Sequence, residues 1–118
     1  MAETSAQWNL LTFAHDVLPN RLFPLVVPIN ATEILIMGGS DGAYKSDVCV
    51  FNTATQEVRR DKESLKLSDS DNQFKFCNFY NQSYVTRNRE VIGRVRDADR
   101  KYHLISYRYG ADTVSKLW

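Results

Sequence analysis

The chain has 118 residues, of which 43% are hydrophobic, 12% aromatic and 25% charged, with a formal net charge of +1. These proportions are ordinary for one globular domain, and the aromatic share is typical of β structure. The near-zero net charge argues against a protein drawn as a whole to nucleic acid or to an anionic membrane. No apolar run approaches the roughly 18 residues that a membrane-spanning helix needs.

The first half of the chain predicts three strands and a charged loop. Residues 23–29 are rich in β-branched side chains, but two prolines remove ladder donors and restrict this strand to a sheet edge. The short apolar run 33–37 predicts a strand buried on both faces, and 48–52 predicts the next strand. Residues 59–72 mix both charges around two leucines. We expect a loop there, with a short edge strand as the alternative.

The second half of the chain predicts an antiparallel meander. Short segments of alternating or apolar character are separated by turn residues, which is typical of all-β sandwiches, barrels and propellers. No segment has helical periodicity, so the predicted fold class is all-β. The expected strands are 74–80, 83–86, 90–96, 102–109 and 113–118.

A glycine pair, Gly38 and Gly39, ends the strand 33–37 and is followed by turn residues and a further apolar strand. Around it, residues 21–58 resemble a kelch repeat, the four-stranded blade of a β-propeller. The resemblance comprises an arginine before the first strand, the glycine pair, an aromatic residue at Phe51 and an apolar residue seven places later at Val58. The family usually has tyrosine and tryptophan at the last two positions.

The resemblance implies two blades, because kelch blades have a period of about 50 residues. Trp8 stands where a preceding repeat would end, and Trp118 marks a comparable place further on. We therefore expect a disordered tail at 1–7, one kelch-like four-stranded antiparallel blade at 8–58 and a degenerate one at 59–118. A compact two-sheet β-sandwich is the alternative fold.

Two isolated blades would leave two large apolar faces exposed, more than a monomer tolerates. Propellers close with more blades, each of which covers its neighbour. We therefore expect the chain to complete a propeller by self-association, as a homo-oligomer, or to be part of a longer protein or larger assembly.

The sequence offers little for catalysis. Its two histidines, His15 and His103, are far apart, and the two cysteines lack metal-ligand spacing. We expect no enzymatic activity, no cofactor and no metal. Cys49 and Cys77 are expected to be buried free thiols, and the N-terminus lacks the features of a secretory signal, which indicates a cytoplasmic protein.

The predicted function is a non-enzymatic, protein-binding scaffold of the kelch type, without membrane attachment. Binding residues concentrate on loops of rigid scaffolds, so the turns are the expected contact sites. The alternative is a nucleic-acid-associated protein that uses the arginine-rich segment 87–101, but acidic residues interrupt that segment and a solvated strand face is favoured. The candidate protein-binding residues are Ser40, Asp41, Ala43, Tyr44, Arg87, Arg89, Asp97 and Arg100.

Overall fold

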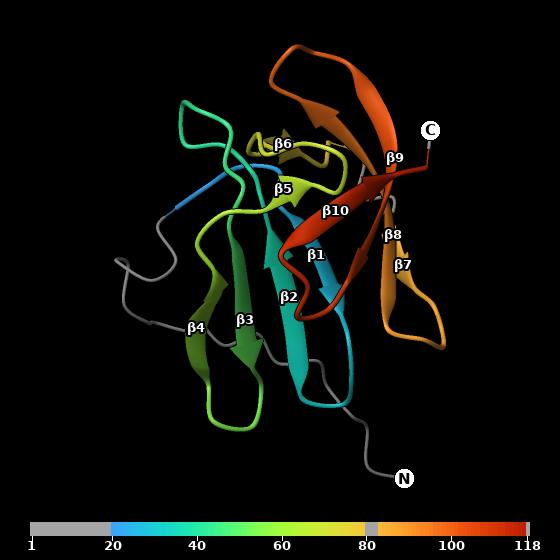
Figure 1. Ribbon diagram of the computed structural model, residues 1–118. Coiled ribbons are helices and arrows are strands. Elements are labelled where there is room, and N and C mark those ends of the chain that lie inside the picture. Colours follow the sequence, from blue (N-terminus) through green and yellow to red (C-terminus); the bar gives the residue numbers. More distant parts are fainter. Residues whose placement is uncertain (1–19, 80–82, 118) are drawn as a thin grey trace, which may run out of the picture.

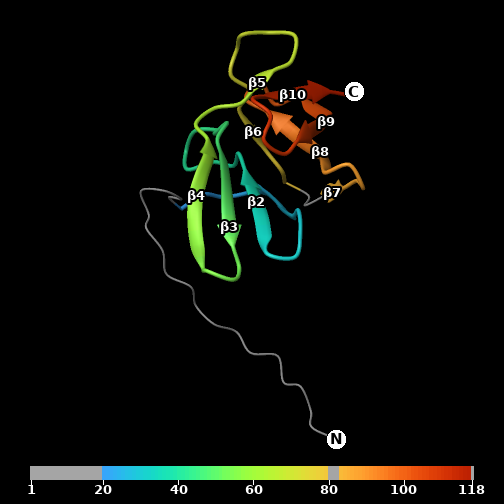
Figure 2. The same ribbon diagram turned by 60° about the horizontal axis from the view of Figure 1, so that its bottom comes forward.

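The computed structural model describes residues 20–79 and 83–117, which form two β-sheets and, within these ranges, no helix (Figure 1). The all-β prediction is confirmed. The predicted tail 1–7 and both tryptophans, Trp8 and Trp118, lie outside the described residues. Figure 2 shows the second sheet above the first.

The first sheet has four strands in the order β1-β2-β3-β4, and each neighbouring pair is antiparallel. The three strands predicted from the first half of the chain are present. The proline-containing β1 is an edge strand, as expected, because an edge tolerates missing donors. The strands are β1 (Leu25–Pro28), β2 (Glu33–Met37), β3 (Val48–Asn52) and β4 (Glu57–Lys62).

The charged segment 59–72 is not one loop, and that prediction is wrong. Residues 59–62 continue β4, and the alternative edge strand near Leu65 exists as β5 (Lys66–Leu67). β4 lies at the sheet edge with most side chains exposed or half-buried, so charged residues are compatible with it. β4 also continues across the expected blade boundary between residues 58 and 59.

The second sheet is a curled sheet of six strands. Its path is β5-β10-β9-β8-β6, β7 also pairs with β8, and the β5–β10 pair is parallel. It therefore differs from the four-stranded antiparallel blade expected for 59–118. β8 is long enough to pair with β7 near its start and with β6 near its end. The remaining strands are β6 (Phe76–Cys77), β7 (Ser83–Val85), β8 (Glu90–Asp97), β9 (Tyr102–Arg108) and β10 (Thr113–Lys116).

One hydrophobic core joins the two sheets. In β2, Leu35 and Met37 are fully buried while Ile34 and Ile36 stay partly exposed, so this strand is fully buried on only one face. The arrangement is compatible with both part of a propeller and a two-sheet sandwich. The core comprises Leu25, Val27, Leu35, Met37, Val48, Val50, Leu65, Phe74, Phe76, Val91, Val95, Ile105, Tyr107 and Val114.

The glycine pair is a contact between the sheets. Gly38 and Gly39 have φ values of 63° and 102°, and the Gly39 amide donates to the Phe76 carbonyl at 2.8 Å. A Cβ on Gly38 would lie 2.6 Å from the Phe76 carbonyl oxygen. Glycine is therefore required here both for positive φ and for the close approach of β6.

An ion pair fixes the chain before β1 to the start of β3. Arg21 donates through Nη1 to Asp47 Oδ1 at 2.6 Å and through Nη2 to Oδ2 at 3.1 Å. Arg21 Nη1 also donates to the Gly38 carbonyl at 3.1 Å. Since the two side chains are only 3% and 11% exposed, this is a desolvated, bidentate pair that holds the glycine turn in place.

Candidate protein-binding face

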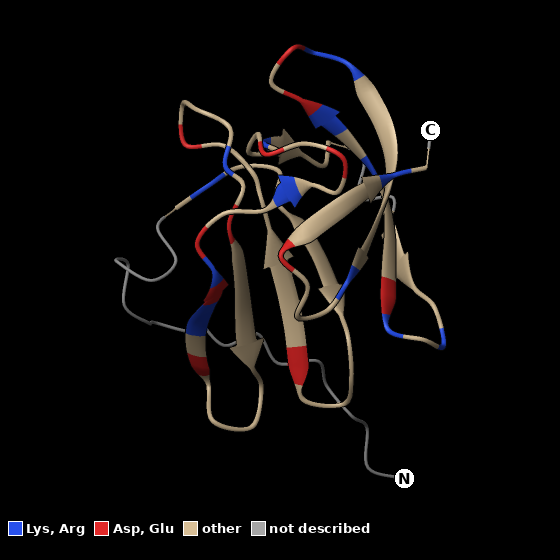
Figure 3. Ribbon diagram, viewed as in Figure 1, with Lys and Arg blue, Asp and Glu red and all other residues tan. Residues whose placement is uncertain are grey.

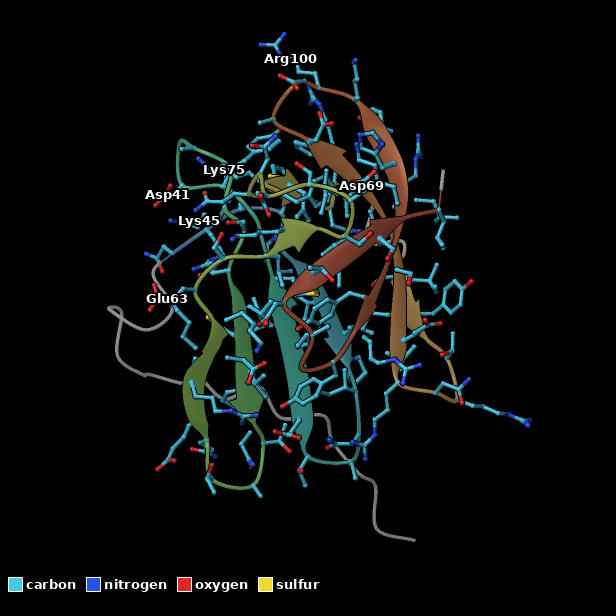
Figure 4. The ribbon with its side chains drawn as sticks, viewed as in Figure 1. Asp41, Lys45, Glu63, Asp69, Lys75 and Arg100 are labelled. Carbon is cyan, nitrogen blue, oxygen red and sulfur yellow. The ribbon has the colours of Figure 1, made fainter. Side chains whose placement is uncertain are left out.

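The predicted contact turn at residues 40–44 is exposed and locally ordered. Ser40 Oγ accepts a hydrogen bond from the Gly42 amide at 3.2 Å, and Asp41 pairs with Lys45 at 3.0 Å (Figure 4). The hydrogen bond from Lys45 lowers the pKa of Asp41. Asp41 and Ala43 are exposed, whereas Ser40 and Tyr44 are half-buried.

The predicted contact residue Asp97 shapes its own hairpin. Its Oδ1 accepts the Asp99 and Lys101 amides at 2.9 and 3.0 Å, and its Oδ2 lies 2.7 Å from His103 Nε2. Burial works to raise the pKa of Asp97, but hydrogen bonds from Lys101 and His103 outweigh burial and lower it. Arg100 is exposed at the tip of this hairpin, as Figure 4 shows, with a φ of 64°.

The structure does not bring the three predicted turns into one site. The 40–44 turn and the 97–100 turn lie at the upper end of the molecule in Figure 1, whereas the turn with Arg87 and Arg89 lies at the lower end. Figure 3 shows basic residues at both ends of the β8 region. The arginine-rich segment 87–101 is therefore spread along a strand and its two turns.

A polar hollow near the first turn is lined mostly by charged side chains. It holds three cations and two carboxylates, and Asp47 is already paired with Arg21 and lies 3.8 Å from Arg60 Nε. Figure 4 marks Lys45, Glu63 and Lys75 around it. The lining side chains thus carry an excess of only one positive charge. It has a volume of about 230 Å³ and is lined by Lys45, Ser46, Asp47, Arg60, Glu63 and Lys75.

The uncovered surface of the second sheet is a stronger candidate site. Tyr84, Tyr102, Leu104 and Leu117 are 62%, 42%, 40% and 53% exposed. They share the sheet side that faces away from the core, since residues at these positions alternate with buried ones such as Ile105. We call the surface of Tyr84, Arg94, Tyr102, Leu104 and Leu117 the outer face.

Strand register brings the outer-face residues together. Arg94 in β8 is directly opposite Leu104 in β9, and Tyr84 in β7 is opposite Ile92. The Leu117 amide donates to the Leu104 carbonyl at 2.7 Å, which continues the surface past β10. The face therefore extends across four adjacent strands.

A hollow lies at the centre of the outer face. Arg94, Tyr102, His103 and Leu104 line a volume of about 230 Å³. The Arg94 Cζ atom lies 4.7 Å from the Tyr102 ring centroid, a cation–π contact that holds the guanidinium at the rim. Cofactor pockets are usually larger, roughly 300–1,000 Å³. The hollow fits a single large side chain better.

Sequence reasoning did not identify the outer face as a site. The alternation of β8 and β9 puts Arg94 and Leu104 on the sheet side away from the core, and this signal was available. The extent of this surface depends on the order of the strands in the sheet, in which β10 pairs with β9 and β5 pairs with β10. The sequence contains no local signal for that order.

The described residues give no support for a metal site, since they contain no group of three or more His, Cys, Asp and Glu side chains suited to an ion. His15 lies outside the described residues. Cys49 and Cys77 are buried free thiols, as predicted, and burial raises the pKa of both.

A scan against protein-family models and searches of curated proteins and solved structures found no match to this chain. In the part of the chain that the structure describes, no helix is long and apolar enough to cross a membrane.

Proposed function

We propose that this chain is a non-enzymatic, kelch-like protein-interaction module, a scaffold that works in the cytoplasm and needs no cofactor. The main support for this proposal is the outer face. Its four large hydrophobic side chains are each at least 40% exposed on one continuous sheet surface around Arg94. Contiguous exposed apolar surface marks interaction sites, and tyrosine and arginine are enriched among the residues that contribute most to binding.

The first sheet supports the kelch-like part of the proposal. It is a four-stranded antiparallel meander with the glycine pair between β2 and β3 and with Arg21 before β1. In β1, β2 and β3, the positions that point away from the core are apolar as well, and Val26 is 48% exposed. A propeller blade needs apolar residues on both faces, because it packs against a neighbour on each side.

We propose that the neighbour of the first sheet comes from a second copy of the chain or from the rest of a longer protein. The cytoplasmic location is supported by the two free, buried cysteines, since oxidising compartments favour disulfides. The exposed turn residues Asp41, Arg87 and Arg100 remain candidate contacts at the rims.

Sedimentation across a concentration series tests self-association. We expect the wild-type chain to associate and Val26→Lys to shift it to the monomer, because a charge placed in an apolar interface loses its hydration. Leu104→Lys is the matched control on the other sheet and should leave association unchanged. A wild-type chain that remains monomeric and unfolds cooperatively contradicts self-association and favours the sandwich.

A further inference from the structure

We infer that the outer face binds an acidic segment of a partner protein, with an apolar side chain in the central hollow and a carboxylate on Arg94. This inference rests on the proposed function and adds the chemistry of the partner.

Charge is unevenly distributed along the chain. Residues 77–118 contain 8 basic and 4 acidic side chains, whereas the rest contains 7 basic and 10 acidic ones. The side of β8 and β9 that faces away from the core carries three arginines and one carboxylate. These are Arg94, Arg96, Arg108 and Glu90. The surface around the outer face is therefore complementary to an acidic partner.

Arg94 is positioned to receive a carboxylate. Its guanidinium lies over the Tyr102 ring, so its orientation is restrained before a ligand arrives. A guanidinium and a carboxylate form paired, charge-assisted hydrogen bonds. The neighbouring aromatic and aliphatic side chains would exclude water from such a pair, which strengthens it.

The hollow beside Arg94 is suited to one apolar side chain. Its volume is about 230 Å³, and Tyr102 and Leu104 form its apolar walls. An apolar cavity of about 150 Å³ is already sufficient for a benzene ring. The matching segment therefore has a leucine- or phenylalanine-sized side chain next to an aspartate or glutamate.

The observations favour a protein segment over a nucleic-acid strand. The arginines of the two turns are separated by the eight residues of β8, on the order of 25 Å at about 3.3 Å per residue. Glu90, Asp97 and Asp99 lie among them in the chain, and Figure 3 shows acidic segments next to the basic ones at both ends of this hairpin. Such a surface does not form the continuous basic track that binds a phosphate backbone.

Fluorescence anisotropy with labelled peptides tests the inference on the full chain. The probes are a peptide of alternating aspartate and leucine, its asparagine–leucine and lysine–leucine counterparts, and a short oligo-dT. We expect the aspartate peptide to bind at least about tenfold more tightly than the asparagine peptide, because only the former pairs with Arg94. Its salt dependence should be shallow, since few ions are released.

Variants locate the contact. Arg94→Glu should weaken the aspartate peptide at least about tenfold and should tighten the lysine peptide, a gain that misfolding cannot produce. Leu104→Lys should weaken both the aspartate and the asparagine peptide, because it fills the hollow with charge. Lys75→Glu, which reverses an exposed charge outside the outer face (Figure 4), is the matched control and should change the binding of the aspartate peptide by less than about twofold.

The contrary outcomes bear differently on the inference and on the proposed function. Equal binding of the aspartate and asparagine peptides, both lost in Leu104→Lys, overturns the acidic partner and leaves a protein-binding face. If none of the peptides binds, the inference is wrong, and the outer face no longer supports the proposed function. Tighter binding of oligo-dT, with a steep loss of affinity in salt, overturns the inference in favour of nucleic acid.

Discussion

Two glycines and one ion pair account for the way the first sheet meets β6. A glycine pair at the end of a strand is typical of positive φ or of a close approach by another segment, and Gly38 and Gly39 show both. The sequence could not indicate the partner, because Phe76 lies 38 residues further along the chain.

Gly38→Ala should destabilise the protein by about 2–4 kcal/mol, since the added Cβ both strains φ and meets the Phe76 carbonyl oxygen at 2.6 Å. Gly110→Ala is the control. Its φ is also positive, at 91°, but nothing lies within 4 Å of the added atom, so only about 1 kcal/mol of strain is expected. Urea unfolding measures both. Equal losses would mean that the approach of β6 contributes nothing.

Asp47→Asn should lower the free energy of unfolding by about 3–5 kcal/mol, because it leaves the buried Arg21 guanidinium without its counter-charge. Asp41→Asn removes an exposed pair with Lys45 and should change stability by less than about 1 kcal/mol. Thermal and chemical unfolding measure the free energy of unfolding of both variants and of the wild type. A small loss for Asp47→Asn would show that Arg21 gains water or another partner.

Among the elements, the β8–β9 hairpin was predicted most closely. Alternating residues and the polar turn at 97–100 specify it locally, and Val91 and Val95, on one face of β8, are both buried. β4 was missed because its charges resemble a loop, although an edge strand accommodates them. The strand predicted at 74–80 is reduced to β6, where the Asn78 amide leaves the ladder and donates to the Phe23 carbonyl at 2.8 Å.

The hairpin turn should contribute a pH-dependent stability. The pKa of Asp97 is lower in the folded chain than its ordinary value, so the carboxylate stabilises the fold above the unfolded pKa of about 4. This contribution disappears as pH falls through the lower, folded pKa. Asp97→Asn should therefore be less stable than wild type at neutral pH, and the difference should shrink toward pH 2.

Urea unfolding of wild type and Asp97→Asn across this pH range measures the effect. Asp99→Asn, exposed in the same turn, is the matched control. A difference between wild type and Asp97→Asn that stays constant from neutral to acidic pH would show that the carboxylate charge is not the stabilising feature.

For the whole molecule, the sequence predicted strands better than their assembly. No local pattern in the chain indicates the parallel pairing of β5 with β10, which joins residues 66–67 to 113–114. The outer face could not be predicted for the same reason. The sheets are further linked by Lys62 Nζ and Asp112 Oδ1 at 2.8 Å and by Arg59, which contacts Glu33 and Tyr109.

These links predict that both sheets unfold together. Blades of a repeat array can open separately, whereas sheets that share one core cannot lose half of it without exposing the other half. Leu35→Ala in β2 and Ile105→Ala in β9 remove fully buried side chains, and each should destabilise the entire chain by about 2–5 kcal/mol. Native-state hydrogen exchange measures this strand by strand. If Ile105→Ala accelerates exchange only in the second sheet, the two sheets are separable units.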